Sequence, residues 1–149
     1  MSTCSTVSRN LDEPMAGTAP TARTWLLLEQ SGPWGARALT SSHLDPALGR
    51  ALEAAARDTG VRIALIRRPG RHADLGTPAT RRVYAAHTTP GGVWLREGTT
   101  TDHGRLLHLD FAALGAGDHT SFDAVLDGRP RTGGPLALVC TNGKRDRCC

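Results

Sequence analysis

An α/β fold is predicted for this 149-residue chain by two kinds of hydrophobic pattern that alternate along it. Short continuous apolar runs occur at TWLLLEQ (residues 24–30) and VRIALIR (residues 61–67). Such runs are typical of strands that are covered on both faces. Between them, apolar residues recur at helical spacing from Leu44 to Ala56. The first half of the chain therefore predicts a right-handed strand–helix–strand unit.

The predicted helix carries its own boundary signals. Asp45 is a good N-cap, and Pro46 suits the first helical position because proline lacks the amide that would have no partner there. Gly60 suits the C-terminal stop. We expect this helix to connect the two buried strands.

The second half predicts a β-hairpin closed by a helix. RRVYAAHT (residues 81–88) and GVWLREG (residues 92–98) are the strands, joined by a Thr-Pro-Gly turn. RLLHLDFAAL (residues 105–114) predicts the helix, for which Asp110 is an alternative start. The complete order, βαβ followed by ββα, is that of a thioredoxin-like core.

Composition divides the chain into four parts. Residues 1–22 predict an irregular arm, and residues 23–116 a thioredoxin-like N-terminal domain. Residues 117–134 are rich in Gly and Asp and predict a linker. Residues 135–149 begin with the apolar run PLALVC and end in a cysteine-rich loop, which predicts the first strand and loop of a second domain.

The net charge of +4 does not indicate a nucleic-acid partner. Seventeen of the eighteen basic residues are arginines, and they are scattered with acidic residues between them. No run reaches the ~18–20 apolar residues of a membrane span, and the N-terminus has no signal-peptide pattern. We therefore expect neither a nucleic-acid nor a membrane partner, and a cytoplasmic location, where thiols stay reduced.

Three of the four cysteines lie in the final segment CTNGKRDRCC: Cys140, Cys148 and Cys149. Neighbouring Lys and Arg side chains favour thiolates, the form that metals and iron–sulfur clusters require. There is no Cys-x-x-Cys, and adjacent cysteines are poorly placed to bind one ion together. The pattern leaves three interpretations open: a metal or cluster site, a thiol redox site, or cysteines without a role.

The terminal segment and the opening quarter of the chain together resemble the sucrase/ferredoxin-like family of thioredoxin-like ferredoxins. The resemblance runs from about Cys4 to Cys149. The matching stretches, besides CTNGKRDRCC, are Glu13-Pro14 with Gly17-Thr18-Ala19, Trp25 to Glu29, and Gly32-Pro33-Trp34-Gly35.

The resemblance implies two thioredoxin-like domains, of which the second is a [2Fe–2S] ferredoxin. Its cysteine ligands, nine positions apart around an Arg-Asp pair, map onto Cys140 and Cys149, with Arg145 and Asp146 as the supporting pair. Cys148 is the substitute if Cys149 is not the ligand. The family's function would be electron transfer with a redox partner that the sequence does not name.

The chain departs from the family pattern in its remaining ligands. The resemblance implies two histidines in a downstream His-x-x-x-His stretch, which this sequence lacks. We therefore expect a C-terminally truncated form that binds no cluster stably by itself. The six histidines are expected on the surface or in satisfied packing, and Cys4 as an exposed thiol.

Two other functions compete with electron transfer. The C-terminal cysteines, Cys148 and Cys149 above all, could act in thiol redox or sensing, or the chain could be a non-catalytic fragment. An enzymatic role is not indicated. Sugar hydrolysis needs two positioned carboxylates, and the four glutamates show no such arrangement.

Overall fold

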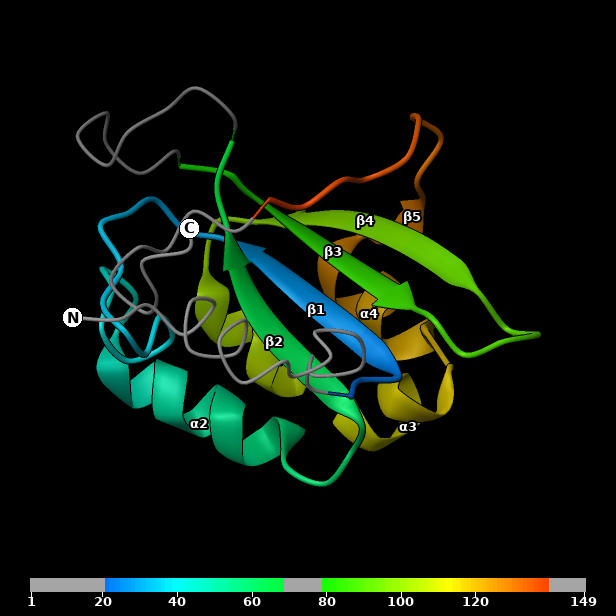
Figure 1. Ribbon diagram of the computed structural model, residues 1–149, viewed down its shortest axis with the longest axis horizontal. Helices are drawn as coiled ribbons and strands as arrows, with labels where there is room; N and C mark the ends of the chain where they lie inside the picture. The colour runs from blue at the N-terminus through cyan, green and yellow to red at the C-terminus, as the bar shows by residue number, and fades with distance from the viewer. Residues whose placement is uncertain (1–20, 69–78, 140–149) are drawn as a thin grey trace, which may run out of the picture.

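The protein is a mixed α/β structure built on one five-stranded sheet (Figure 1). The computed structural model describes residues 21–68 and 79–139. The strands are β1 (Thr24–Glu29), β2 (Val61–Ile66), β3 (Arg81–His87), β4 (Trp94–Thr100) and β5 (Arg129–Pro130). The helices are α2 (Pro46–Ala56), the 3-10 helix η1 (His103–His108), α3 (Phe111–Ala116) and α4 (Thr120–Leu126).

The strands are arranged in the order β2-β1-β3-β4-β5. β1 pairs in parallel with β2, in a register that places Thr24 opposite Val61. β1 pairs antiparallel with β3, β3 with β4, and β4 with the short β5. The first strand in the chain is therefore an inner strand, and the chain adds pairs on both sides of it.

The described helices form one layer against one face of the sheet, as Figure 1 shows. Helix α2 packs on β2 and η1, and α4 packs on β4 and η1. The core between the layers is aliphatic with two phenylalanines, and its fully buried members include Leu26, Leu52, Leu114 and Phe122. None of the described helices is long and apolar enough to cross a membrane.

Strand β1 is buried on both faces, which confirms the prediction from its continuous apolar run. Leu26 and Leu28 point toward the helices and are 0% exposed. Leu27 points to the opposite face and is 2% exposed. Alternation along a strand sends neighbours to opposite faces, so only a strand covered on both sides has this pattern.

Helix α2 begins where the sequence predicts. The Asp45 carboxylate accepts a hydrogen bond from the Ala47 amide at 2.8 Å, and Pro46 is the first helical residue. The helix ends at Ala56, before Gly60, so the predicted stop was placed too late. Gly60 instead has a φ of +83° in the turn that leads into β2, a conformation that favours glycine.

The helix predicted over residues 105–114 is two elements. η1 precedes Asp110, and α3 follows it, with the Asp110 carboxylate accepting from the Ala113 amide at 2.9 Å. The alternative start at Asp110 is thus confirmed for the α-helix. The second hairpin strand also lies later than predicted, at Trp94–Thr100 instead of residues 92–98.

The stretch predicted as a linker, residues 117–134, contains regular structure. Its helix α4 buries Phe122 and Leu126 completely, and β5 pairs with β4. The prediction of an irregular segment was wrong because two buried apolar residues anchor a seven-residue helix within a Gly- and Asp-rich composition. The predicted strand over PLALVC is also absent from its described part, residues 135–139.

We predict that Phe122→Ala lowers the free energy of unfolding by about 3–5 kcal/mol, because it removes a fully buried ring and leaves a cavity. Chemical denaturation followed by circular dichroism measures this. Leu107→Ala, at a side chain that is 41% exposed on η1, is the matched control and should change stability by less than about 1 kcal/mol. If Phe122→Ala and Leu107→Ala both change the free energy of unfolding by a similarly small amount, α4 does not belong to the folded core.

Candidate functional site

The residues predicted as cluster ligands lie outside the described residues. This holds for Cys140, Cys148 and Cys149, for the supporting pair Arg145 and Asp146, and for Cys4. Within residues 21–68 and 79–139, no three His, Cys, Asp or Glu side chains are grouped to hold a metal ion. The described part of the chain contains no cysteine at all.

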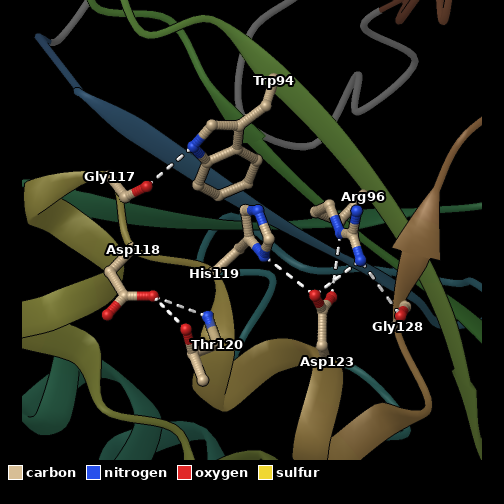
Figure 2. A network of polar contacts seen from close by, with 8 residues as sticks. All are labelled: Trp94, Arg96, Gly117, Asp118, His119, Thr120, Asp123 and Gly128. Carbon is tan, nitrogen blue, oxygen red and sulfur yellow. Dashed lines mark hydrogen bonds and ion pairs between the residues drawn. The ribbon is translucent and has the colours of Figure 1, made fainter.

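One polar network ties α3 and α4 to the edge of the sheet (Figure 2). Asp123 on α4 accepts two hydrogen bonds from Arg96 on β4, at 2.9 and 2.5 Å, and one from His119 Nδ1 at 2.8 Å. Arg96 also donates to the Gly128 carbonyl at 3.2 Å. This carboxylate has three donors, so its arrangement is that of a structural anchor.

Trp94 lies at the other end of this network, between two histidine rings. Its indole donates to the Gly117 carbonyl at 2.8 Å, and its ring stacks on His87 and meets His119 edge-on. Nearby, the side chain and backbone amide of Thr120 donate to Asp118 and lower the pKa of that carboxyl. Trp94 therefore packs and donates within this network.

His87 is buried, and its tautomer follows from its partner. The hydroxyl of Thr24 donates its single proton to the Leu114 carbonyl at 2.8 Å. The same oxygen lies 2.7 Å from His87 Nδ1, so Nδ1 must carry the hydrogen and donate. The ring therefore links β1 to β3, and through Thr24 to α3.

A second polar cluster lies at the carboxyl ends of the parallel strands β1 and β2. We call it the carboxyl-edge cluster and define it as Glu29, Gln30, Arg68, Arg81 and His103. In open α/β sheets, ligands bind at this edge of the parallel strands. Its position makes it the candidate site among the described residues.

Glu29 is the anionic centre of the carboxyl-edge cluster. It is 5% exposed and accepts from Arg68 Nε at 2.6 Å and Nη2 at 3.2 Å. The backbone amide of Arg82 donates to it at 2.9 Å. The ion pair and its hydrogen bonds raise the pKa of the Arg68 guanidinium. These three hydrogen bonds offset the free-energy cost of burying the Glu29 carboxylate.

The other half of the cluster is the half-buried cation of Arg81 beside a neutral imidazole. Arg81 Nη1 contacts His103 Nδ1, and because arginine only donates, Nδ1 is the acceptor. His103 is 3% exposed. Burial and the positive charge of Arg81 lower the pKa of His103 to about 4. His103 is therefore neutral at pH 7.

Two buried atoms of this cluster have no hydrogen-bond partner among the residues that the structure describes. They are Gln30 Oε1, an acceptor, and Arg81 Nε, a donor. A buried polar atom without a partner costs about 1–3 kcal/mol. The cluster can therefore accept a polar group that both donates and accepts, but it presents no nucleophile and no set of metal ligands.

An apolar pocket of about 510 Å³ lies on the sheet face opposite the helices. Trp25 and Leu95 contribute to its wall from β1 and β4, and Leu136 and Leu138 contribute from the segment after β5. That segment ends at Val139, which is 82% exposed and directly precedes Cys140. The described chain thus approaches the predicted cysteine loop along this apolar face.

No family model, no curated protein and no solved structure matches this chain. The family resemblance of the sequence therefore stays a prediction.

Sequence reasoning missed the carboxyl-edge cluster. The sequence pattern places Glu29 and Gln30 at the end of an apolar strand, and Arg81 and Arg82 at the start of a hairpin strand. The signal that could have found them is the placement of polar residues directly where one buried strand ends and another begins. Those ends meet only if β1 pairs with β3, which the single sequence does not show.

We predict that stability falls as the pH drops from about 7 to 4, through His103. Its folded pKa of about 4 lies below the usual 6.5, so the unfolded chain binds more protons in this interval. The folded state then loses on the order of 3 kcal/mol. Urea denaturation at pH 7.0, 5.5 and 4.5 measures it.

His103→Gln should flatten this pH dependence, while His108→Gln, on the exposed side of the same 3-10 helix, should leave it as in the wild type. An unchanged slope in His103→Gln would contradict the assignment.

Proposed function

We propose that the described sheet is the thioredoxin-like domain of a sucrase/ferredoxin-like protein. The order β2-β1-β3-β4, with one parallel and two antiparallel pairings, supports this fold. So does the α2 crossover between the parallel strands. The turn after β1, SGPWG, contains no cysteine, so this domain has no dithiol chemistry of its own.

The function proposed for the protein is electron transfer through a [2Fe–2S] cluster at the C-terminal segment. The observation that carries it is the pair Cys140 and Cys149, nine positions apart around Arg145-Asp146 in CTNGKRDRCC. The basic side chains favour thiolates, and thiolates are the ligands of such clusters. When bound, the cluster would supply one-electron transfer.

The chain supplies half of the four ligands that the cluster needs. Three described histidines are already engaged: His87 with Thr24, His103 with Arg81 and His119 with Asp123. The described residues also include no cysteine that could join these histidines in a ligand set. For the 149-residue chain by itself, a second copy is the source that completes a four-thiolate set.

The apolar face beside Val139 supports the same site. Trp25, Leu95 and Leu138 surround the pocket next to which the described chain ends. An apolar surround limits solvent access to a cluster and tunes its potential.

We predict that anaerobic reconstitution of the full chain with iron and sulfide gives a [2Fe–2S] absorption spectrum only in the dimer fraction. Two chains supply four thiolates, whereas one chain supplies two. Size-exclusion chromatography with iron and sulfide analysis of each fraction measures this. A four-thiolate cluster should have a potential near about −400 mV, below that of mixed cysteine–histidine ligation.

Cys140→Ser and Cys149→Ser should each abolish the cluster, while Cys4→Ser is the matched control and should retain it. If Cys148→Ser loses the cluster and Cys149→Ser retains it, then Cys148 is the ligand in place of Cys149. Retention in Cys140→Ser, or no cluster in the wild type, would contradict the proposal.

Thiol redox chemistry is the second candidate, favoured by the adjacent Cys148 and Cys149 beside Arg147. If it operates, a mild oxidant removes two protons' mass from the intact monomer, and reductant restores them. Peptide mass spectrometry then locates the bond between Cys148 and Cys149. A bond to Cys4, or only intermolecular products, would exclude this function.

A further inference from the structure

A cleft of about 420 Å³ lies between helix α2 and the segment that precedes it. It is distinct from the carboxyl-edge cluster and from the apolar pocket, since it shares no residue with either. Its lining residues are Arg37, Thr40, Arg50, Glu53 and Arg57. Four of these five side chains are charged, so a polar ligand suits the cleft.

One wall of the cleft is a single face of α2. Arg50, Glu53 and Arg57 are spaced by three and four residues, which places them above one another on the helix. Arg57 is the C-cap residue, so this wall extends to the end of the helix.

The other wall is held against the helix by a close backbone contact. A Cβ on Gly49 would lie 2.0 Å from the carbonyl oxygen of Leu39, so only glycine permits this approach. Within the segment, the amides of Thr40 and Ser41 donate to the Arg37 carbonyl at 3.0 and 2.7 Å. Arg37 and Thr40 are therefore held opposite the helix before any ligand arrives.

The charges in the cleft are not neutralised by the described part of the chain. Arg37, Arg50 and Arg57 form no ion pair or side-chain hydrogen bond there, and Glu53 is the single acidic lining residue. This contrasts with Arg68 and Arg96, each of which has a carboxylate partner. Three guanidinium groups beside one carboxylate leave an excess of two positive charges.

We propose that this cleft binds a small phosphorylated ligand. Guanidinium groups bind phosphate oxygens through paired hydrogen bonds, and three arginines line this cleft. The hydroxyl of Thr40 is a further donor. Glu53 accepts from a hydroxyl group of the same ligand, which makes a sugar phosphate a better fit than a bare phosphate. The volume lies in the range of small-molecule sites.

Titration of the full ¹⁵N-labelled chain at fixed ionic strength tests the proposal, with ribose 5-phosphate, inorganic pyrophosphate and sulfate as probes. We expect saturable shifts of the amides around residues 37–40 and 50–57 with both phosphates, and weaker ones with sulfate. Arg50→Gln and Arg57→Gln should each weaken binding about tenfold. Arg105→Gln, at an exposed arginine on η1, is the matched control and should bind as the wild type does.

Glu53→Ala separates a specific site from general attraction of anions. It should weaken ribose 5-phosphate and strengthen pyrophosphate, because it removes both the acceptor oxygens and a negative charge. Non-saturable shifts, or equal losses in Arg105→Gln and Arg50→Gln, would overturn the proposal. Tighter binding of a single-stranded oligonucleotide, weakened by Arg105→Gln as well, would also overturn it in favour of a nucleic-acid surface.

Discussion

The burial of strand β1 between β2 and β3 is the constraint on which the rest of the structure depends. Its apolar side chains are covered on both faces, so the strand can occupy only an inner position in the sheet. Its parallel partner requires a crossover, which α2 supplies, and its antiparallel partner begins the hairpin. The two polar anchors then lie at its two ends: Thr24 with His87 at the start, and Glu29 with Arg68 at the finish.

Charge is distributed unevenly over this framework. Carboxylates on the sheet and on α4 are paired with arginines, as in Glu29 with Arg68, Asp123 with Arg96, and Glu97 with Arg129. These pairs join segments that are 27 to 39 residues apart. Among the described residues, Arg37, Arg50 and Arg57 line the cleft beside α2 without a carboxylate partner, and further basic residues flank the terminal cysteines in the sequence. The sheet thus acts as a scaffold, and the proposed phosphate site lies beside it, on α2.

Local pattern predicted the parts of the fold that local interactions determine. The four longer strands and α2 follow from apolar runs, from helical spacing and from the Asp45-Pro46 start. Helix α4 could not be predicted, because its stability comes from Phe122 and Leu126 packing into a core assembled by distant segments. The apolar run at residues 135–139 predicted a strand that the structure does not show, because no described strand pairs with it. Hydrophobicity alone does not supply a partner.

The candidate sites divide in the same manner. The cysteine motif is contiguous, so the sequence displays it, although its residues lie outside those that the structure describes. The carboxyl-edge cluster joins Arg81 to His103 and Glu29 to Arg68, contacts that exist only after the sheet has formed. The cleft beside α2 likewise depends on the Gly49 approach to Leu39, which no spacing rule reveals.

Iron K-edge X-ray absorption on the reconstituted full chain would show which atoms bind the iron. We expect a first shell of sulfur alone and a second iron at the distance of a bridged pair, because the proposed ligands are the thiolates of Cys140 and Cys149 together with inorganic sulfides. A first shell of oxygen and nitrogen with no neighbouring iron would mean that iron is bound adventitiously, and would contradict the ferredoxin assignment.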